Sequence, residues 1–118
     1  ISQYAALEAL RVCEPYVQEM REEYNRRRQL ICSGLNAMGL KTSKPGGAFY
    51  VFPDVSSSGM DDEEFAEKLL YEEHVAVVPG RSFGDSGIGF VRCSYATEYH
   101  CIEIALERMQ AFLKRHRA

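Results

Sequence analysis

The chain has 118 residues, of which 46% are hydrophobic and 26% are charged. These proportions are ordinary for one globular domain with a modest core, and they argue against a disordered chain. The net charge of -3 argues against a nucleic acid as a partner, because binding to phosphates takes a basic face.

The cysteines indicate a compartment rather than a site. Cys13, Cys32, Cys93 and Cys101 form no C-x-x-C pair, and the three histidines are scattered, so we expect no metal site. Reduced thiols of this kind are typical of a cytoplasmic protein. No signal peptide is visible and no apolar run approaches the roughly 18 residues of a membrane span, so we expect no membrane partner.

The first third of the chain is predicted to form two helices. Residues 2–14 are rich in helix formers, and Pro15 then ends or kinks the helix because it has no amide hydrogen. Pro15 suits the first turn of a second helix, Tyr16 to Met38, for which Gly39 is a natural stop. This second helix carries an apolar stripe made of Tyr16, Met20, Tyr24, Ile31, Leu35 and Met38.

Two strands are predicted next, a short one at Leu40 to Ser43 and a stronger one at Ala48 to Pro53. Lys44 to Gly47 supplies the bend between them, and Ser56 to Gly59 is a loop.

A third helix is predicted to follow Asp61, which caps it and has Glu64 at the third helical position. Met60 and Phe65 are placed to pack together across this cap. The predicted buried face of the helix consists of Phe65, Leu69 and Leu70.

Two more strands and a helix complete the chain. The β-branched run Val75 to Val78 predicts a buried strand, which Pro79 and Gly80 end. Arg81 to Gly87 is a loop, and Ile88 to Thr97 reads as a strand whose last residue caps the final helix. The apolar positions of that helix are Ile102, Ala105, Leu106, Met109, Phe112 and Leu113.

The predicted order is therefore α-α-β-β-α-β-β-α. It indicates an α/β (α+β) fold, a two-layer sandwich in which a mixed sheet of three or four strands has helices on one face. The chain starts at Ile1 rather than Met and opens directly into a helix. We therefore expect a piece of a longer protein, with residues 1–38 as connector helices and residues 39–118 as a small domain.

Arg92 is the residue that most needs an explanation. Side chains alternate along a strand, so Phe90, Arg92 and Ser94 share one face. An unpaired cation inside a sheet is costly, and the guanidinium must therefore have a partner or lie near water. An ion pair with an Asp or Glu, or a side chain that reaches the rim, would satisfy it. Alternatively, Arg92 faces a cleft and receives a carboxylate that arrives with a ligand.

The other candidate residues name no reaction by themselves. PGRSFG, Pro79 to Gly84, lacks the lysine of a phosphate loop, and we expect a tight turn with Phe83 packed under it. The glycines of KPGGAFYVFP, Lys44 to Pro53, either admit a close ligand or simply turn the chain. We expect Tyr95 in the core and His100 on the surface, because no second acid–base group is paired with either.

Three sequence blocks together resemble a known family. KPGGAFYVFPDV, VAVVPGRSFG and GFVRCSYA, followed by a helix containing IEIALERM, are similar in content and spacing to the C-terminal part of class I and II aminotransferases. These are fold-type I enzymes that depend on pyridoxal phosphate, in the aspartate and aromatic aminotransferase group. The opening SQYAALEAL is similar to the helix that follows the cofactor lysine, so the resemblance covers essentially the whole chain.

The resemblance implies a division of labour between two domains. In such enzymes a large domain holds pyridoxal phosphate on a lysine, and the small domain closes over the amino acid. The arginine of the G-F-V-R-x-S-Y block binds the α-carboxylate of the amino acid or 2-oxoacid, and that arginine is Arg92 here. Phe49 falls where the family places an aromatic ring near the substrate. The missing large domain is the implied partner, and the whole protein is implied to be a homodimer.

The resemblance also implies what this chain lacks. None of Lys41, Lys44, Lys68 and Lys114 stands in the family's cofactor-lysine segment, so we expect no catalytic residue, no bound cofactor and no activity in this piece alone. Two alternatives remain: a C–S lyase of the same fold, or a non-catalytic α/β module for a ligand or a protein, in which Arg92 is satisfied internally.

Overall fold

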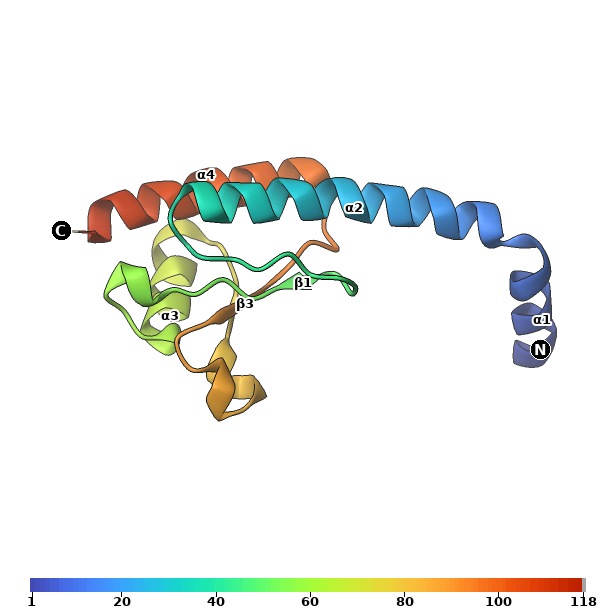
Figure 1. Cartoon of the computed structure of the whole chain (residues 1–118), viewed down its shortest axis with the longest axis horizontal. Helices are drawn as coiled ribbons and strands as arrows, with labels where there is room; N and C mark the ends of the chain where they lie inside the picture. The colour runs from blue at the N-terminus through green and yellow to red at the C-terminus, as the bar shows by residue number, and fades with distance from the viewer. Residues whose placement is uncertain (118) are drawn as a thin grey trace.

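The computed structural model describes residues 1–117 (Figure 1). Its helices and strands are α1 (Ser2–Val12), α2 (Glu14–Ala37), β1 (Tyr50–Val51), α3 (Asp62–Glu73), β2 (Val78–Pro79), β3 (Val91–Ser94) and α4 (Tyr99–His116). Three short 3₁₀ turns lie at Ser56–Ser58, Gly80–Phe83 and Asp85–Gly87.

The two predicted N-terminal helices are confirmed, and their boundaries follow from two residues. Pro15 lies in the first turn of α2, where a missing amide hydrogen costs no helical hydrogen bond. The chain leaves α2 at Gly39, which adopts a left-handed φ of 84° that glycine tolerates without strain. Arg117, just after α4, donates to the carbonyl of Met38 and to Ser57 Oγ, and so ties the ends of α2 and α4 together.

The sheet has three strands in the order β1-β3-β2. The strand number is as predicted, but both pairings are antiparallel, so the expectation of a mixed sheet was wrong in this respect. The register places Tyr50 opposite Ser94 and Val78 opposite Arg92. The predicted short strand at Leu40 to Ser43 is reduced to one isolated bridge, between Thr42 and Pro53.

The predicted strand at Val75 to Val78 begins only at its last residue. Val75 is nevertheless buried in the core, with 9% of its surface exposed. A β-branched run reports side-chain burial as much as backbone pairing, and here Val75 is buried without being paired.

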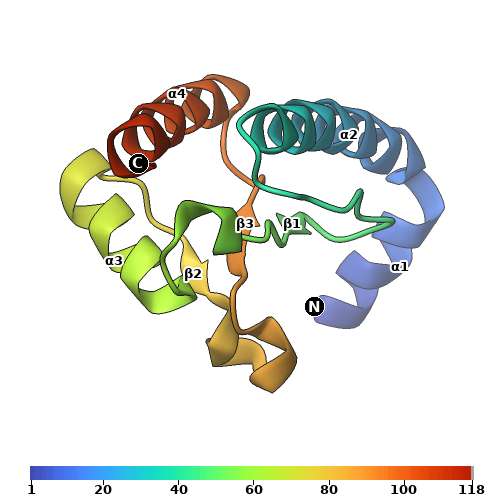
Figure 2. The same cartoon turned by 60° about the vertical axis from the view of Figure 1, so that its left-hand side comes forward.

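The helices and the sheet form the two predicted layers. α2 and α4 lie side by side over one face of the sheet, and α3 packs beside α4 and β2 (Figure 2). The core between the layers is apolar, and its fully buried members include Leu35, Val51, Phe65, Val91 and Phe112. Burial alternates along β3, so Val91 and Cys93 face the helices while Arg92 and Ser94 face away.

α1 and the first half of α2 project from this sandwich. The molecule measures 57 × 29 × 24 Å, and α1 lies at the far end of the long helix α2 (Figure 1). No residue of α1 is buried, and α2 buries only Ile31 and Leu35. The first half of the predicted apolar stripe is therefore uncovered by residues 1–117, with Tyr16 69% and Met20 54% exposed.

Helix caps were predicted with mixed success. The Asp61 carboxylate accepts a hydrogen bond from the Glu64 amide at 2.9 Å, as the capping pattern predicted. Thr97 does not cap α4, because Glu98 takes the N-cap position and the Thr97 carbonyl accepts from Arg27 instead.

Leu70 is 45% exposed rather than buried, because α4 and β2 contact the side of α3 that carries Phe65 and Leu69.

Candidate functional site

Arg92 lies on the central strand with two aromatic rings beside its guanidinium. Its Cζ atom is 4.3 Å from the centroid of the Tyr50 ring and 4.7 Å from that of Phe83. Both distances are within the range of cation–π attraction. A guanidinium that lies over ring faces keeps its N–H groups at its edge, where they remain able to bind a planar acceptor.

Arg92 has no internal counter-ion among residues 1–117. No Asp or Glu oxygen of these residues lies within 4.0 Å of its nitrogens, and its side chain takes part in no hydrogen bond there. The side chain is only partly buried. Of the arrangements that the sequence allowed, the internal ion pair is thus absent among residues 1–117, and the guanidinium is half-buried and faces away from the helices.

Phe49, the second residue singled out from the sequence, lies next to the same tyrosine. Its ring centroid is 4.6 Å from that of Tyr50 and 6.1 Å from that of Tyr24, with which it is stacked. Phe49 is 39% exposed. The Tyr50 ring thus contacts both predicted site residues, Phe49 and Arg92.

The turn before Phe49 is held in an unusual conformation by Tyr95. Ala48 has a positive φ of 59°, which is strained for a residue with a side chain. The Tyr95 hydroxyl donates to the Ala48 carbonyl at 2.8 Å, and the Tyr95 amide donates to the Phe49 carbonyl at 2.9 Å. Burial raises the pKa of Tyr95, which is 1% exposed. Tyr95 is therefore a core residue, as predicted, and His100 is exposed beside Glu103.

Two hollows flank this arrangement. One, of about 430 Å³, lies beside the glycine turn and is lined by Arg21, Glu22, Tyr24, Asn25, Arg28, Gly46, Gly47, Ala48 and Tyr95. The other, of about 300 Å³, is lined by Phe52, Phe83, Ser86, Gly87 and Phe90. The second hollow is largely aromatic, and it adjoins Arg92 through the Phe83 ring.

Phe83 does not pack under its turn, as the sequence led us to expect. The turn is present as two 3₁₀ segments, but Phe83 is 49% exposed and contacts Phe52 edge-on at 5.6 Å as well as Arg92. The reason is steric. Gly80 and Gly87 bring their backbones so close that a Cβ on Gly80 would lie 2.1 Å from the Gly87 carbonyl oxygen, which leaves no room for a ring between them.

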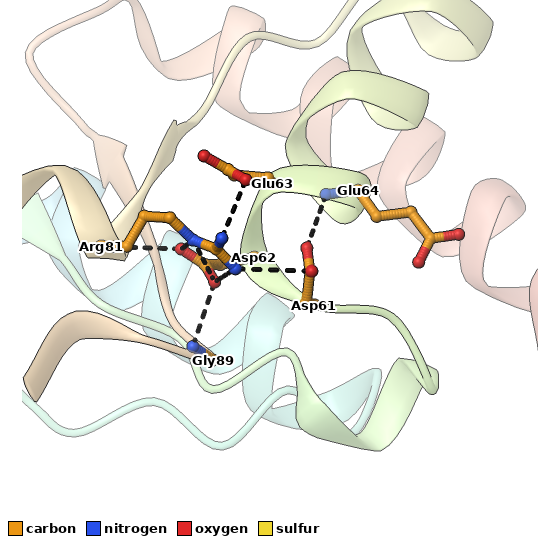
Figure 3. A network of polar contacts seen from close by, with 6 residues as sticks. All are labelled: Asp61, Asp62, Glu63, Glu64, Arg81 and Gly89. Atoms are coloured by element: carbon orange, nitrogen blue, oxygen red, sulfur yellow. Dashed lines mark hydrogen bonds and ion pairs between the residues drawn. The ribbon is translucent and has the colours of Figure 1, made fainter. Parts of the chain in front are cut away.

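A buried carboxylate that sequence reasoning missed holds this turn (Figure 3). The side chain of Asp62 is 0% exposed, and its oxygens accept from the Arg81 amide at 3.0 Å and from the Arg81 guanidinium at 2.8 to 3.2 Å. The Gly89 amide donates to the same carboxylate at 3.4 Å. The Arg81 hydrogen bonds hold the pKa of Asp62 well below its usual range, although burial alone would raise it.

Glu63 completes the pairing of Arg81 from the solvent side. Its Oε2 atom accepts from Arg81 Nη1 at 2.8 Å, and its side chain is 61% exposed. The only sequence signal for this network is the run of acidic residues at the start of α3, which reads equally well as a stabilised helix end. Nothing in that run marks Asp62 as the buried member.

Comparison with known proteins places the chain in a family. The sequence model of aminotransferase class I and II matches residues 1–109. The chain belongs to the class I and II aminotransferase family. The aspartate aminotransferase of Pyrococcus abyssi is 52% identical over 114 residues, which are 95% of this chain and 29% of that protein.

Solved structures of aminotransferases share the fold. The aromatic aminotransferase of Pyrococcus horikoshii superimposes with a TM-score of 0.93 at 51% identity, covering 96% of this chain and 31% of that one. The Thermus thermophilus aspartate aminotransferase with maleate gives a TM-score of 0.84 at 47% identity, covering 92% of this chain and 28% of that one. The chain thus spans less than a third of the length of the aminotransferases that it matches.

Class I and II aminotransferases depend on pyridoxal phosphate, and the lysines described here do not fit that cofactor. A lysine that forms a Schiff base needs a lowered pKa, which a desolvated pocket provides. Lys41, Lys44 and Lys114 are exposed. Lys68 pairs with Glu64 at 2.7 Å, and this contact raises the pKa of Lys68. None of these four lysines therefore has the desolvated environment that a Schiff-base lysine needs.

The structure of residues 1–117 also bears on membranes and metals. No helix there combines the length and the apolar content needed to cross a membrane. No group of three or more His, Cys, Asp or Glu side chains there is arranged to hold a metal ion.

Proposed function

We propose that this chain is the substrate-closing C-terminal part of a pyridoxal-phosphate-dependent aminotransferase, which moves an amino group from an amino acid to a 2-oxoacid. Family membership and the coverage of about 29% of the matched relatives support this proposal. In it, residues 1–38 connect the segment to a larger cofactor-binding part, and residues 39–118 form the small domain. The exposed apolar residues of α1 and of the start of α2 support a covering partner there.

Arg92 binds the α-carboxylate of the substrate in this proposal. The observation that carries it is a half-buried guanidinium on the central strand with aromatic faces beside it and no counter-ion among residues 1–117. Such a group offers two parallel N–H donors to a carboxylate, which fixes the orientation of the amino acid. Phe49, whose ring also contacts Tyr50, lines the pocket next to the substrate.

Several of the matched relatives support a carboxylate as a common element of recognition. They are named for aspartate and for aromatic amino acids, and one of the solved structures contains maleate, a dicarboxylate. These compounds differ in the rest of the molecule, and all carry a carboxylate. We therefore assign the carboxylate to Arg92 and leave the choice of side chain to residues outside this segment.

The remaining features of the whole protein follow from the same family likeness. We propose a homodimer whose cofactor lysine lies outside this chain. A reducing compartment, the cytoplasm, suits the four cysteines, which are all free. Burial raises the pKa of Cys93 to about 12, which keeps that thiol protonated and unreactive.

The test is Arg92→Leu in the whole protein, with steady-state kinetics for several amino acids. Loss of a bidentate, charge-assisted hydrogen bond should lower kcat/KM about 10- to 100-fold for every amino acid, with a higher KM. The matched control is Arg26→Leu, which removes another guanidinium that lies over a ring, 4.4 Å from Tyr99, away from the candidate site. It should leave the kinetics unchanged.

Two results would count against the proposal. Unchanged kinetics in Arg92→Leu would remove Arg92 as the carboxylate anchor. A transaminase forms one oxoacid for each new amino acid. Release of pyruvate and free ammonia instead would assign the protein to a C–S lyase of the same fold.

A further inference from the structure

A single buried carboxylate holds the two pieces of chain that meet at Arg92. Asp62 accepts from the backbone and the side chain of Arg81, two residues before Phe83. It also accepts from the amide of Gly89, three residues before Arg92. One side chain thus fixes both the segment that carries the Phe83 ring and the entry to the strand that carries the guanidinium (Figure 3).

We infer that Asp62 and Arg81 are positioning residues for Arg92 and set the angle at which its guanidinium meets a substrate carboxylate. This inference rests on the proposed role of Arg92. The pair acts through Phe83, whose ring lies 4.7 Å from the Arg92 Cζ atom. Neither Asp62 nor Arg81 touches the substrate.

The physical need for such a device follows from the geometry of the guanidinium. An arginine side chain has many rotamers, and two parallel hydrogen bonds to a carboxylate form only when its plane is oriented correctly. Tyr50 is fixed by the β1–β3 ladder, but Phe83 comes from the 3₁₀ turn Gly80–Phe83 and is 49% exposed. Without an anchor for the turn, the Phe83 ring would move relative to Arg92.

The Asp62–Arg81 contacts give the turn that anchor. The carboxylate is fully buried and accepts from two backbone amides as well as a guanidinium, so breaking it would leave an unpaired buried charge. Arg81 also pairs with Asp61 and Glu63. These acidic residues at the start of α3 are therefore paired with Arg81 and not with Arg92.

The experiment is a set of variants in the whole protein, assayed for KM and kcat with one amino acid. Asp62→Asn and Phe83→Leu should each raise KM about three- to tenfold, the scale of a lost cation–π contact, with kcat within about twofold of the parent. Phe83→Tyr keeps the ring and should retain the parental KM. Glu63→Gln, which removes the exposed carboxylate on Arg81 and leaves the turn anchored, is the matched control and should also retain it.

The deciding measurement repeats Asp62→Asn and Phe83→Leu in an Arg92→Leu background. If both residues act through Arg92, neither raises KM further once the guanidinium is gone. If Asp62→Asn does not accumulate as folded protein, Arg81→Lys takes its place with the same expectation, because it keeps a cation next to Asp62 and removes the paired guanidinium donors that hold the turn.

The outcomes separate the two proposals. A normal KM in Arg92→Leu alone overturns the carboxylate role and this inference together. A raised KM in Arg92→Leu overturns only the positioning role if Asp62→Asn and Phe83→Leu leave KM unchanged in the parent background. The same holds if they raise KM in the Arg92→Leu background by as much as in the parent. A purely structural Asp62 would give one of these two results together with a lower melting temperature.

Discussion

Arg92 shows how far a single residue can be understood from its neighbours along the chain. Alternation along the strand predicted that Arg92 and Ser94 share one face, opposite to Val91 and Cys93, and the structure confirms this. Which of the two faces is buried came only from the structure, where Val91 and Cys93 are buried and Arg92 and Ser94 face away from the helices. The two aromatic rings beside the guanidinium could not be predicted in the same way. Phe83 reaches it from a turn, and no periodic pattern fixes where a turn residue points.

Asp62 gives a prediction at the same scale, for the pH dependence of stability. Its pKa in the folded protein lies below the ordinary value of about 4, so the carboxylate stabilises the fold above that pH. The stabilisation is lost as the pH falls from the unfolded-state pKa toward the folded-state value. Asp62→Asn should therefore lower the free energy of unfolding by about 2 kcal/mol at neutral pH, because a buried charged hydrogen bond is lost.

The difference between the parent and Asp62→Asn should narrow as the pH falls from 6 to 3. Urea unfolding midpoints measured across this range check the prediction. Glu63→Gln, on the same guanidinium but exposed, should change the midpoint little at any pH. A difference between the parent and Asp62→Asn that grows toward low pH would contradict this account of Asp62.

Elements were predictable where one residue decides their boundary. Pro15 and Gly39 fixed the start and the end of α2, and Asp61 fixed the start of α3. Thr97 failed as a cap because the competing residue, Glu98, has the extended backbone that the N-cap position needs. Residues 75–77 failed as a strand because their composition reflects burial, and pairing with β3 starts only at Val78.

The exposed surface of α1 and of the first half of α2 gives a prediction about the proposed cofactor-binding part. Their apolar side chains are uncovered in residues 1–117, with Tyr4 81% and Leu10 87% exposed. In the 118-residue chain alone, the amides of Ser2–Val12 should exchange with at most about tenfold protection, since little tertiary contact holds that helix. In the whole protein they should be protected at least about a hundredfold more, because the cofactor-binding part covers them.

Hydrogen exchange read out by mass spectrometry measures both states. The peptide around Leu35, which is 0% exposed in this segment, is the internal control and should be protected in the whole protein as well as in a folded segment. Equal, fast exchange of Ser2–Val12 in the two samples would contradict the role of residues 1–38 as a connector.

At the scale of the whole molecule, the sequence was sufficient for the layers and insufficient for strand direction. Apolar periodicity placed the helices on one face of a sheet, and the structure has that two-layer form (Figure 2). Strand alternation is the same in parallel and antiparallel pairs, so the antiparallel order β1-β3-β2 could not be read from it. The proposal that Arg92 binds a carboxylate came from family likeness, because the residue pattern alone favoured an internal ion pair or a guanidinium at the rim of the sheet.

The most direct test of this account is a crystal structure of the whole protein with a bound dicarboxylate such as maleate. We expect one carboxylate of the ligand to accept two parallel hydrogen bonds from the Arg92 guanidinium, at about 2.7–2.9 Å, with the Tyr50 and Phe83 rings still beside it. A ligand carboxylate bound elsewhere, with Arg92 paired to an Asp or Glu of the protein, would contradict it.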